Sequence, residues 1–445
     1  MKRDIYKQLI QWKLSKRRKP LLIRGARQVG KTYILQEFGT KEYDKVFYCN
    51  FEEKPALNDF FKESLSPDKL LNNLSLYFND TISEEKDLLI FDEIQLSNQA
   101  LNALKYFCEN AKGFHIACAG SLIGVKVSGP SSFPVGKVNF LDMYPMTFLE
   151  FLDACQKSNL RTLIEQTKSF ESYPLPFHNE LIDYLKKYYF IGGMPEAVSY
   201  FSETGKITEI REIQHEIVNA YQLDFAKHAP PTDIPKLQII WDSIPAQLAK
   251  ENKKFIFSAI RKSARAREYE NAIQWLKDAG LIYMSYQVTT PKFPLSGYIT
   301  SAFKMFMLDI GILGAMAKLS HRILLEGDQF FTEFKGAFIE NYVAQQLKAE
   351  KQADLFYWVS SGKKAEIDFL CEIDGTIFPL ETKAAINPRS KSLKSYDQQF
   401  SPKVLSRTTL LNLKQDGIIC NYPLYSITLF PELGENTGNP TPFLG

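Results

Sequence analysis

The sequence is poor in the residues that build disulfide frameworks and zinc sites. Its 445 residues contain six cysteines and five histidines, and the cysteines form no C-x-x-C pair. Zinc sites are usually marked by closely spaced cysteine or histidine pairs, and disulfide-stapled proteins are small and rich in cysteine. We therefore expect neither class, and cysteines that stay reduced indicate a cytoplasmic protein.

Long apolar runs and a strong charge of one sign are also missing. No stretch approaches the roughly 20 apolar residues of a membrane span, and the basic amino terminus lacks the apolar core of a secretion signal. The formal net charge is only +3. We expect no membrane partner, and a nucleic-acid surface would need local clustering of Lys and Arg.

The first part of the chain has the pattern of a parallel α/β sheet. Short apolar runs alternate there with helical stretches, which predicts a first domain over residues 1–155. The expected strands are 21–23, 46–48, 88–91 and 116–119. Helical periodicity then dominates 156–231, which indicates a lid or linker segment.

The second half predicts two further modules and a tail. Short helices followed by a hairpin of 281–286 and 298–308 fit a winged-helix module over 232–325. A second α/β domain is expected over 326–430, before a loose tail at 431–445 that is rich in Pro and Gly. Its expected elements are a helix at 334–348 and strands at 355–359, 366–371 and 376–383.

A P-loop motif, G-x-x-x-x-G-K-[ST], follows the first expected strand and opens a helix, which is the context that the motif requires. Backbone N–H groups of such a loop surround phosphate, the lysine reaches the β and γ phosphates, and the hydroxyl ligates Mg²⁺. The sequence therefore predicts binding of ATP and Mg²⁺. The expected nucleotide-binding residues are Gly25, Ala26, Arg27, Gln28, Val29, Gly30, Lys31 and Thr32.

Two other strand ends supply partners for this loop. The apolar run 88–91 ends in Asp92 and Glu93. We expect Asp92 to bind Mg²⁺ through water and Glu93 to polarise the attacking water, which with Lys31 would make an ATP hydrolase. The alternative is an acidic helix cap after a strand. Ser121, after the run 116–119, is a candidate sensor of the γ-phosphate, with a plain turn as its alternative.

These segments together resemble a known family. They are RGARQVGKTYIL, LLIFDEIQ, the AGS of 119–121, GKVNFLDMYPMTFLEFL, YFIGGMPEAV, and AEIDFL with LETKAA. Over nearly its whole length the chain is similar to AAA-type P-loop ATPases of bacteria and archaea that carry a carboxy-terminal domain of uncharacterised function. The resemblance implies an ATPase core, a helical segment, a winged helix and a restriction-endonuclease-like α/β domain of the PD-(D/E)XK nuclease fold.

The chain departs from this family at Lys137. Relatives usually have Gly-Arg where this sequence has Gly136 and Lys137. A lysine ammonium lacks the flat, bidentate fork with which arginine holds phosphate. An arginine finger is therefore left unassigned.

An acidic site is predicted in the carboxy-terminal domain from strand register. Asp374 and Gly375 form a strong two-residue hairpin turn. If Ile373 pairs with Thr376, the ladder sets Asp368 opposite Glu381 and Glu366 opposite Lys383, with all four side chains on one face. Two opposed carboxylates repel unless a cation lies between them or one is protonated.

A divalent metal is one resolution of this repulsion. Glu340 lies on a nearly all-apolar helix and is expected to be partly buried. The nuclease interpretation puts Glu340, Asp368 and Glu381 around a second divalent metal, with Lys383 polarising water or stabilising developing charge. The alternative is a purely structural arrangement with a Glu366–Lys383 pair on an exposed sheet face.

The segment 261–267 is the candidate DNA contact, because it falls where a winged helix would hold its recognition helix. Its cations are Arg261, Lys262, Arg265 and Arg267, and the alternative is a solvated helix face. The leading hypothesis is Mg²⁺-dependent ATP hydrolysis coupled to a DNA-directed, nucleolytic carboxy-terminal region. The alternative is a regulatory switch ATPase whose carboxy-terminal domain is a non-catalytic partner-binding module. The oligomeric state stays open, a homo-oligomer included.

Overall fold

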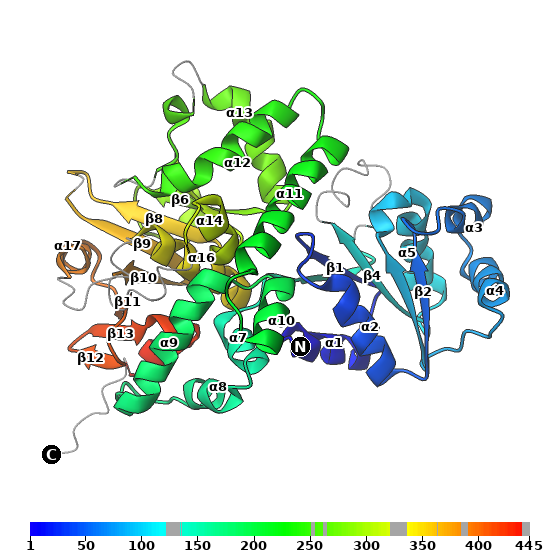
Figure 1. Cartoon of the computed structure of the whole chain (residues 1–445), viewed down its shortest axis with the longest axis horizontal. Coiled ribbons are helices and arrows are strands. Elements are labelled where there is room, and N and C mark those ends of the chain that lie inside the picture. Colours follow the sequence, from blue (N-terminus) through cyan, green and yellow to red (C-terminus); the bar gives the residue numbers. More distant parts are fainter. Residues whose placement is uncertain are drawn as a thin grey trace. The chain divides into compact units, whose positions relative to one another are not determined.

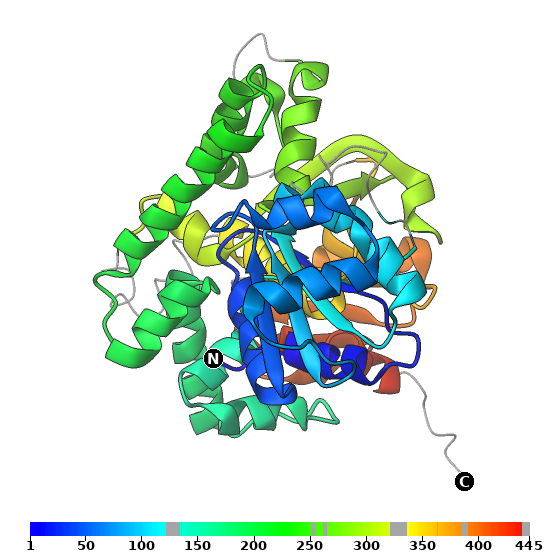
Figure 2. The same cartoon turned by 90° about the vertical axis from the view of Figure 1, so that its right-hand side faces the viewer.

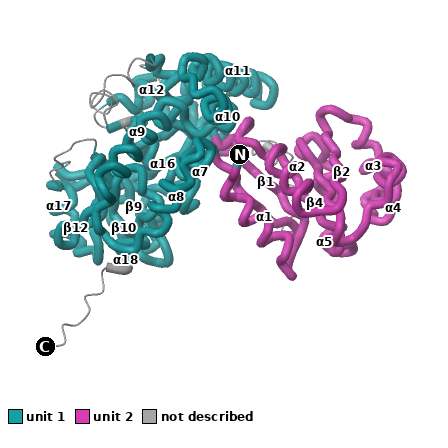
Figure 3. The backbone as a smooth tube through the Cα atoms, turned by 60° about the horizontal axis from the view of Figure 1, so that its bottom comes forward, with its two compact units in different colours: residues 1, 145–277, 281–445 teal, residues 2–144, 278–280 magenta. Residues whose placement is uncertain are grey.

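The computed structural model describes residues 1–121, 134, 136–250, 254–260, 265–320, 336–362, 364–383 and 390–437. Its backbone divides into two compact units (Figures 1 and 3). Unit 2 comprises residues 2–144 and 278–280, and unit 1 comprises residue 1, 145–277 and 281–445. Each unit is described separately below.

Unit 2 is an α/β layer structure built on five strands. Its strands are β1 Leu21–Gly25, β2 Lys45–Asn50, β3 Asp87–Asp92, β4 His115–Ser121 and β5 Asn139–Asp142. Its helices are α1 Ile5–Leu14, α2 Lys31–Glu42, α3 Leu57–Glu63, α4 Pro67–Phe78 and α5 Asn98–Asn110. The four strands predicted from the sequence are confirmed, whereas β5 was not predicted.

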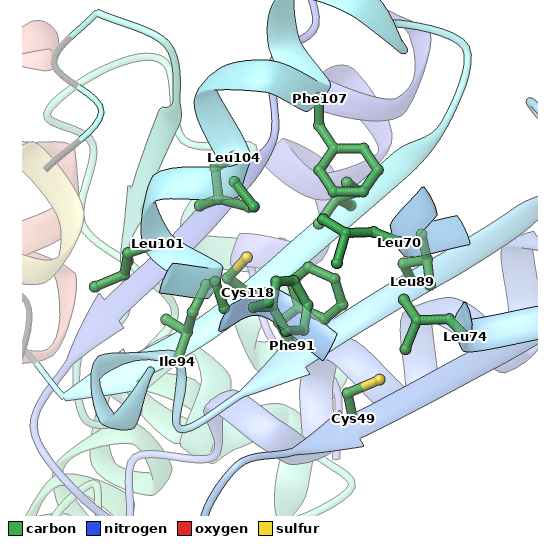
Figure 4. Packing of buried hydrophobic residues seen from close by; sticks show 14 of the residues in the cluster. Cys49, Leu70, Leu74, Leu89, Phe91, Ile94, Leu101, Leu104, Phe107 and Cys118 are labelled. Carbon is green, nitrogen blue, oxygen red and sulfur yellow. The ribbon is translucent and has the colours of Figure 1, made fainter. Parts of the chain in front are cut away.

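All neighbours in the five-stranded sheet are parallel, in the order β2-β3-β4-β1-β5. Blue and cyan helices flank these strands (Figure 2). One face is buried under α3, α4 and α5 in a cluster that includes Cys49, Phe91, Leu104 and Cys118 (Figure 4). Because both faces of a parallel sheet are covered, β3 is buried along its whole length, and its carboxyl end delivers Asp92 to the sheet edge.

Unit 1 begins with a helical segment. Its helices are α7 Phe148–Ala154, α8 Ser158–Glu165, α9 Leu175–Ile191, α10 Pro195–Thr204, α11 Ile210–His228, α12 Ile234–Leu248 and α13 Ala266–Asp278. The start of α7 is fixed by a capping box, in which Thr147 and Glu150 each accept a hydrogen bond from the other's backbone N–H. The helical character expected for 156–231 is confirmed.

The rest of unit 1 is an eight-stranded mixed sheet with helices. Its order is β12-β13-β11-β10-β9-β8-β6-β7. The strands are β6 Ile282–Val288, β7 Ile299–Met307, β8 Leu355–Val359, β9 Glu366–Ile373, β10 Thr376–Thr382, β11 Leu405–Thr409, β12 Lys414–Asp416 and β13 Ile419–Pro423. The remaining helices are α14 Ile310–Met316, α16 Ala337–Lys351, α17 Lys391–Phe400 and α18 Glu432–Thr437.

The winged-helix expectation is not confirmed. The hairpin of β6 and β7 forms as predicted, but β6 also pairs in parallel with β8, which the sequence assigned to the next domain. The boundary expected near residue 325 therefore does not separate two sheets. Parallel pairing between distant segments leaves no local signal, so periodicity alone could not indicate this continuity.

Within the described part of the chain, no helix is both long and apolar enough to cross a bilayer.

Candidate functional site: a P-loop and a buried ionic cluster

The P-loop has the backbone conformation that phosphate binding needs. Gln28 and Gly30 both have positive φ, at 63° and 95°. Alternation of such residues with ordinary ones turns successive N–H groups toward one concavity, and glycine adopts this conformation without strain. Gly30 then opens α2, whose first turn has no side-chain cap. The donors of that first turn therefore face the loop and suit an anion such as phosphate.

Lys31 and Thr32 are held in this loop by hydrogen bonds. The ammonium of Lys31 is buried and donates to the carbonyl oxygens of Gly25 and Ala26, at 3.1 and 2.8 Å. The Thr32 hydroxyl donates to Oδ2 of Asp92 at 2.7 Å. Because Thr32 and Asp92 are the pair expected around Mg²⁺, these two residues and the donor-rich loop fit the nucleotide and its metal ion.

A tyrosine that the sequence did not single out completes the Asp92 environment. Tyr48, on the neighbouring strand β2, donates its hydroxyl to the same Oδ2 at 2.7 Å, and Asn50 donates to that hydroxyl at 3.2 Å. Burial, followed by the hydrogen bond to Asp92, raises the pKa of Tyr48, so its hydroxyl stays a donor. The sequence feature that could have identified Tyr48 is the alternation along β2, which points every second side chain toward the same face of the sheet.

Glu93 follows Asp92 in a left-handed backbone conformation, with φ at 50°. Its N–H donates to Oδ1 of Asp92 at 3.0 Å, and its carboxylate accepts a hydrogen bond from Gln95. A non-glycine residue at positive φ is uncommon and costs backbone energy. Glu93 is thus turned away from the strand direction and held beside Asp92.

Two other predicted positions have different outcomes. The side chain of Ser121 lies outside the described residues, although its backbone ends β4. The ammonium of Lys137 lies 2.8 Å from the carboxylate of Glu109 on α5. That hydrogen bond raises the pKa of Lys137 and keeps it charged.

Arg3 supports the P-loop and was not predicted. Its guanidinium is buried and donates to the carbonyl oxygen of Val29 at 2.9 Å and to that of Tyr144 at 2.7 Å. One side chain thus joins the P-loop to the segment that follows β5. The basic residues near the amino terminus offered no signal that would distinguish this one.

The predicted hairpin register in the carboxy-terminal region is confirmed over most of its length. Asp374 and Gly375 both have positive φ, and the pairs run from Thr376 opposite Ile373 to Leu380 opposite Phe369. Among the described pairs, neither Asp368–Glu381 nor Glu366–Lys383 occurs. Asp368 instead accepts hydrogen bonds from the N–H and the hydroxyl of Thr382, at 2.7 and 3.0 Å. A register shift between β8 and β9 lies beside this point.

Glu340 is buried as predicted, with 2% of its surface exposed, but its partner is a residue that the sequence analysis missed. Lys304 on β7 is fully buried, and its Nζ lies 3.1 Å from Glu340, 2.5 Å from Glu366 and 3.9 Å from Asp368. The proposed structural pair Glu366–Lys383 is therefore replaced by Glu366–Lys304. A lysine inside the apolar run of β7 was the available signal, because a buried charge needs partners.

Glu381 and Lys383 form the second half of this cluster. Their charged groups lie 3.2 Å apart, with Glu381 1% exposed. Burial raises the pKa of Glu381. Burial alone would lower the pKa of Lys383, but the charges of Asp368, Glu381 and Glu340 raise it above its usual value. Lys383 thus stays an ammonium.

The metal expected in this cluster is not confirmed. Among the described residues, no group of three His, Cys, Asp or Glu side chains is arranged to hold a metal ion. The repulsion between carboxylates is instead relieved by the two ammonium groups of Lys304 and Lys383.

The Gly192–Gly193 turn is held by hydrogen bonds to two other segments of unit 1. Gly193 accepts from the N–H of Met146 and donates its own N–H to Asp309, both at 2.6 Å. A Cβ on Gly193 would lie 2.1 Å from the Met146 carbonyl oxygen. Asp309 also accepts from Ile312 N–H and from the Gln345 amide, each at 3.0 Å.

Two of the four cations in the basic segment 261–267 lie within the described residues. Arg261 and Lys262 lie outside the described residues. Arg265 and Arg267 are exposed at the start of α13.

Three family models match separate parts of the chain. Residues 17–152 match an AAA domain. Residues 182–322 match a domain of unknown function, DUF8612, and residues 335–427 match another, DUF4143. The first match covers the part of the chain that contains the P-loop, and its description agrees with the P-loop geometry. The other two carry no functional description.

Individual relatives are distant. An uncharacterized protein of Methanocaldococcus jannaschii, MJ1637, is 26% identical over 211 residues, which span 44% of this chain and 42% of that protein. The match thus covers less than half of this relative.

Several solved structures match the chain at low identity and low TM-score. A Walker-type ATPase of Pyrococcus abyssi is 13% identical, with a TM-score of 0.44, over 71% of this chain and 95% of that one. The Orc1 protein of Aeropyrum pernix in complex with DNA is 12% identical, with a TM-score of 0.31, over 71% and 90%. The RuvB Holliday junction branch migration motor of Thermotoga maritima is 13% identical, with a TM-score of 0.31, over 68% and 93%. We draw no functional conclusion from TM-scores of this size.

Proposed function

We propose that this chain hydrolyses ATP in unit 2 with Mg²⁺. The observation that carries the proposal is the 2.7 Å hydrogen bond between the Thr32 hydroxyl and Asp92, at the end of a P-loop with its lysine in place. When bound, Mg²⁺ would neutralise charge on the phosphates. Thr32 and Asp92 are the residues that would hold it, Asp92 through water.

The other residues have distinct roles in this proposal. The N–H groups of residues 25–32 orient the phosphates, and Lys31 would exchange its two carbonyl acceptors for phosphate oxygens. Glu93 would polarise the attacking water from its position beside Asp92, with Gln95 holding its carboxylate. Positioning and charge stabilisation supply nearly all of the rate enhancement in such reactions.

The test compares ATP binding and turnover in three variants. Lys31→Ala should lose binding and turnover together, because the lysine contacts the phosphates in both states. Glu93→Gln should keep binding and lose about 10²-fold or more in turnover, because only the water-activating group changes. Lys41→Ala, which removes an exposed lysine from the same helix, is the control. Full turnover in Glu93→Gln would contradict the proposed role of Glu93.

For unit 1 we propose binding without cleavage, with DNA as the partner. Exposed Arg265 and Arg267 at the start of α13 support a phosphate contact. The two units are joined covalently at Tyr144 and Pro145, and Met146, the next residue, is hydrogen-bonded to Gly193 within unit 1. ATP hydrolysis stimulated by DNA, with a stimulation that falls steeply with salt, is the expected result. The double variant Arg265→Ala, Arg267→Ala should reduce the stimulation of ATP hydrolysis by DNA. If DNA has no effect on the ATPase rate of the unaltered protein, a protein partner is favoured instead.

The nuclease hypothesis is the competing function for unit 1. It is supported by the convergence of Glu340, Asp368 and Lys383, and it is weakened by Lys304, which uses the same carboxylates. Single- and double-stranded DNA should stay intact with Mg²⁺ or Mn²⁺, with and without ATP. Cutting that disappears in Asp368→Ala would overturn our proposal and establish a nuclease.

A further inference from the structure

The side chain of Lys304 occupies the centre of the acidic cluster in unit 1. Its Nζ contacts carboxylates from α16 and β9, at 3.1 Å from Glu340, 2.5 Å from Glu366 and 3.9 Å from Asp368. None of the lysine surface is exposed. The Lys304 ammonium therefore neutralises these carboxylates as a bound metal ion would in the same place.

Two other side chains, those of Ser285 and Tyr357, lie beside the Lys304 side chain. Ser285 is the residue paired with Lys304 on the next strand, and it is small and fully buried. The ring of Tyr357 lies 4.9 Å from the ammonium, which adds a cation–π contact. Burial alone would lower the pKa of Lys304, but the three carboxylates raise it above its usual value. The lysine therefore remains charged across the whole physiological range.

The cluster does not fit the divalent metal that the nuclease-like resemblance implies. A magnesium ion needs carboxylate oxygens at about 2.0–2.1 Å. The same oxygens of Glu340 and Asp368 face the Lys304 ammonium, and a second cation placed there would be repelled by it. Glu381, the third expected ligand, contacts Lys383 instead.

We propose that Lys304 is the resident cation of this cluster and closes it to divalent metals, so that removing its charge opens a metal site formed by Glu340, Glu366 and Asp368. The inference deepens the proposed non-catalytic role of unit 1. Its test reads out metal binding rather than DNA cleavage, so the two can fail separately.

The test is a titration of the whole chain with Mn²⁺. The electron paramagnetic resonance signal of the free ion is recorded at each step and reports how much Mn²⁺ is bound. All proteins carry Thr32→Ala and no nucleotide is added, which removes the P-loop metal site from the measurement. The protein with Lys304 intact should bind no Mn²⁺ at stoichiometric concentrations. Lys304→Ala should bind a single Mn²⁺ per chain, and the ion should raise the melting temperature of this variant only.

Two further variants make the result specific. Lys351→Ala removes a lysine that contacts one exposed carboxylate, that of Glu432, and should gain no Mn²⁺ site. Adding Glu366→Gln to Lys304→Ala should weaken the new site about tenfold or more, because one charged ligand is lost. If Lys304→Ala is too unstable to purify, its refolding yield should rise with Mn²⁺.

Two results would overturn the inference. One is stoichiometric Mn²⁺ binding by the protein with Lys304 intact that is lost in Asp368→Asn, since the cluster would then accept metal beside the lysine. The other is a Lys304→Ala protein that folds, or refolds, without any response to Mn²⁺. In either case Lys304 would be a structural ion pair and not a substitute for a metal.

Discussion

Oδ2 of Asp309 lies 2.6 Å from the backbone nitrogen of Gly193, and this hydrogen bond joins two segments that are 116 residues apart. Asp309 is fully buried and begins α14, and Gly193 belongs to the turn before α10. Burial raises the pKa of Asp309, while the N–H groups of Gly193 and Ile312 lower it. Its hydrogen-bond donors stabilise the buried carboxylate, and without the carboxylate those donors would lose this acceptor.

We predict that Asp309→Ala destabilises unit 1 by about 3 kcal/mol or more. The substitution leaves buried donors of Gly193, Ile312 and Gln345 without this acceptor, and each such group costs roughly 1–3 kcal/mol. Urea unfolding followed by tryptophan fluorescence measures the loss, since three of the four tryptophans lie in unit 1.

The matched control for this experiment is Asp242→Ala, which removes an exposed carboxylate from α12. It should change the free energy of unfolding by less than about 0.5 kcal/mol. Equal effects of the two substitutions would mean that the hydrogen bonds of Asp309 do not stabilise unit 1.

A second prediction concerns the close approach at Gly193. A Cβ there would meet the Met146 carbonyl oxygen at 2.1 Å and its nitrogen at 2.8 Å, and neither backbone atom can move without shifting the chain. Gly193→Ala should therefore cost about 1–3 kcal/mol in the same unfolding measurement. Gly297→Ala is the control, because no atom lies within 4 Å of its added Cβ. An unchanged midpoint in Gly193→Ala would show that the turn can relax.

The P-loop and the strand end beside it could be predicted from the sequence because their signals are local. The motif of residues 25–32 is contiguous, and Asp92 and Glu93 end a strand whose apolar run is unmistakable. The register of the β9–β10 hairpin was equally local, since Asp374 and Gly375 fix it through a two-residue turn. Such features need no knowledge of distant segments.

The residues that were missed depend on contacts between distant segments. Lys304 reaches carboxylates that lie 36 to 64 residues further along the chain, and Arg3 reaches Tyr144. The winged-helix interpretation was not confirmed for the same reason, because β6 ends at Val288 and pairs with β8, which begins only at Leu355. A single sequence carries the charge of Lys304 but not the identity of its partners.

A third prediction follows from the contact of Arg3 with the P-loop. Arg3→Ala should weaken binding of Mg²⁺–ATP about tenfold, or about 1.4 kcal/mol, because the Val29 carbonyl loses its donor and the loop is held less firmly. Arg3→Lys should recover part of the lost affinity, because a lysine can keep one of the two hydrogen bonds, to Val29 or to Tyr144. The measurement is the dissociation constant of a fluorescent ATP analogue.

Lys2→Ala is the control for Arg3, since it removes the same charge from an exposed neighbouring position. Equal weakening in both variants would assign the effect to net charge. No weakening in Arg3→Ala would mean that the P-loop keeps its conformation without this support.

The last prediction is a loss of unit 2 stability in mild acid that depends on His115. This side chain is buried in β4, and its Nδ1 lies 2.7 Å from the Tyr43 hydroxyl. Burial lowers the pKa of His115 to about 4, helped by the positive charges of Arg18 and Lys13. The folded state thus holds His115 neutral at a pH where the unfolded chain, with a pKa near 6.5, already binds a proton.

The sign of the effect follows from this difference. The contribution of His115 is fully present above pH 6.5 and is lost as the pH falls toward 4, by about 2 kcal/mol between pH 7.5 and pH 5. Hydrogen–deuterium exchange of β4, corrected for intrinsic rates, should show this loss of protection, and His115→Gln should flatten it because no proton is then taken up. A wild-type slope equal to that of His115→Gln would mean that His115 titrates alike in the folded and unfolded states, and that other groups govern the acid response of unit 2.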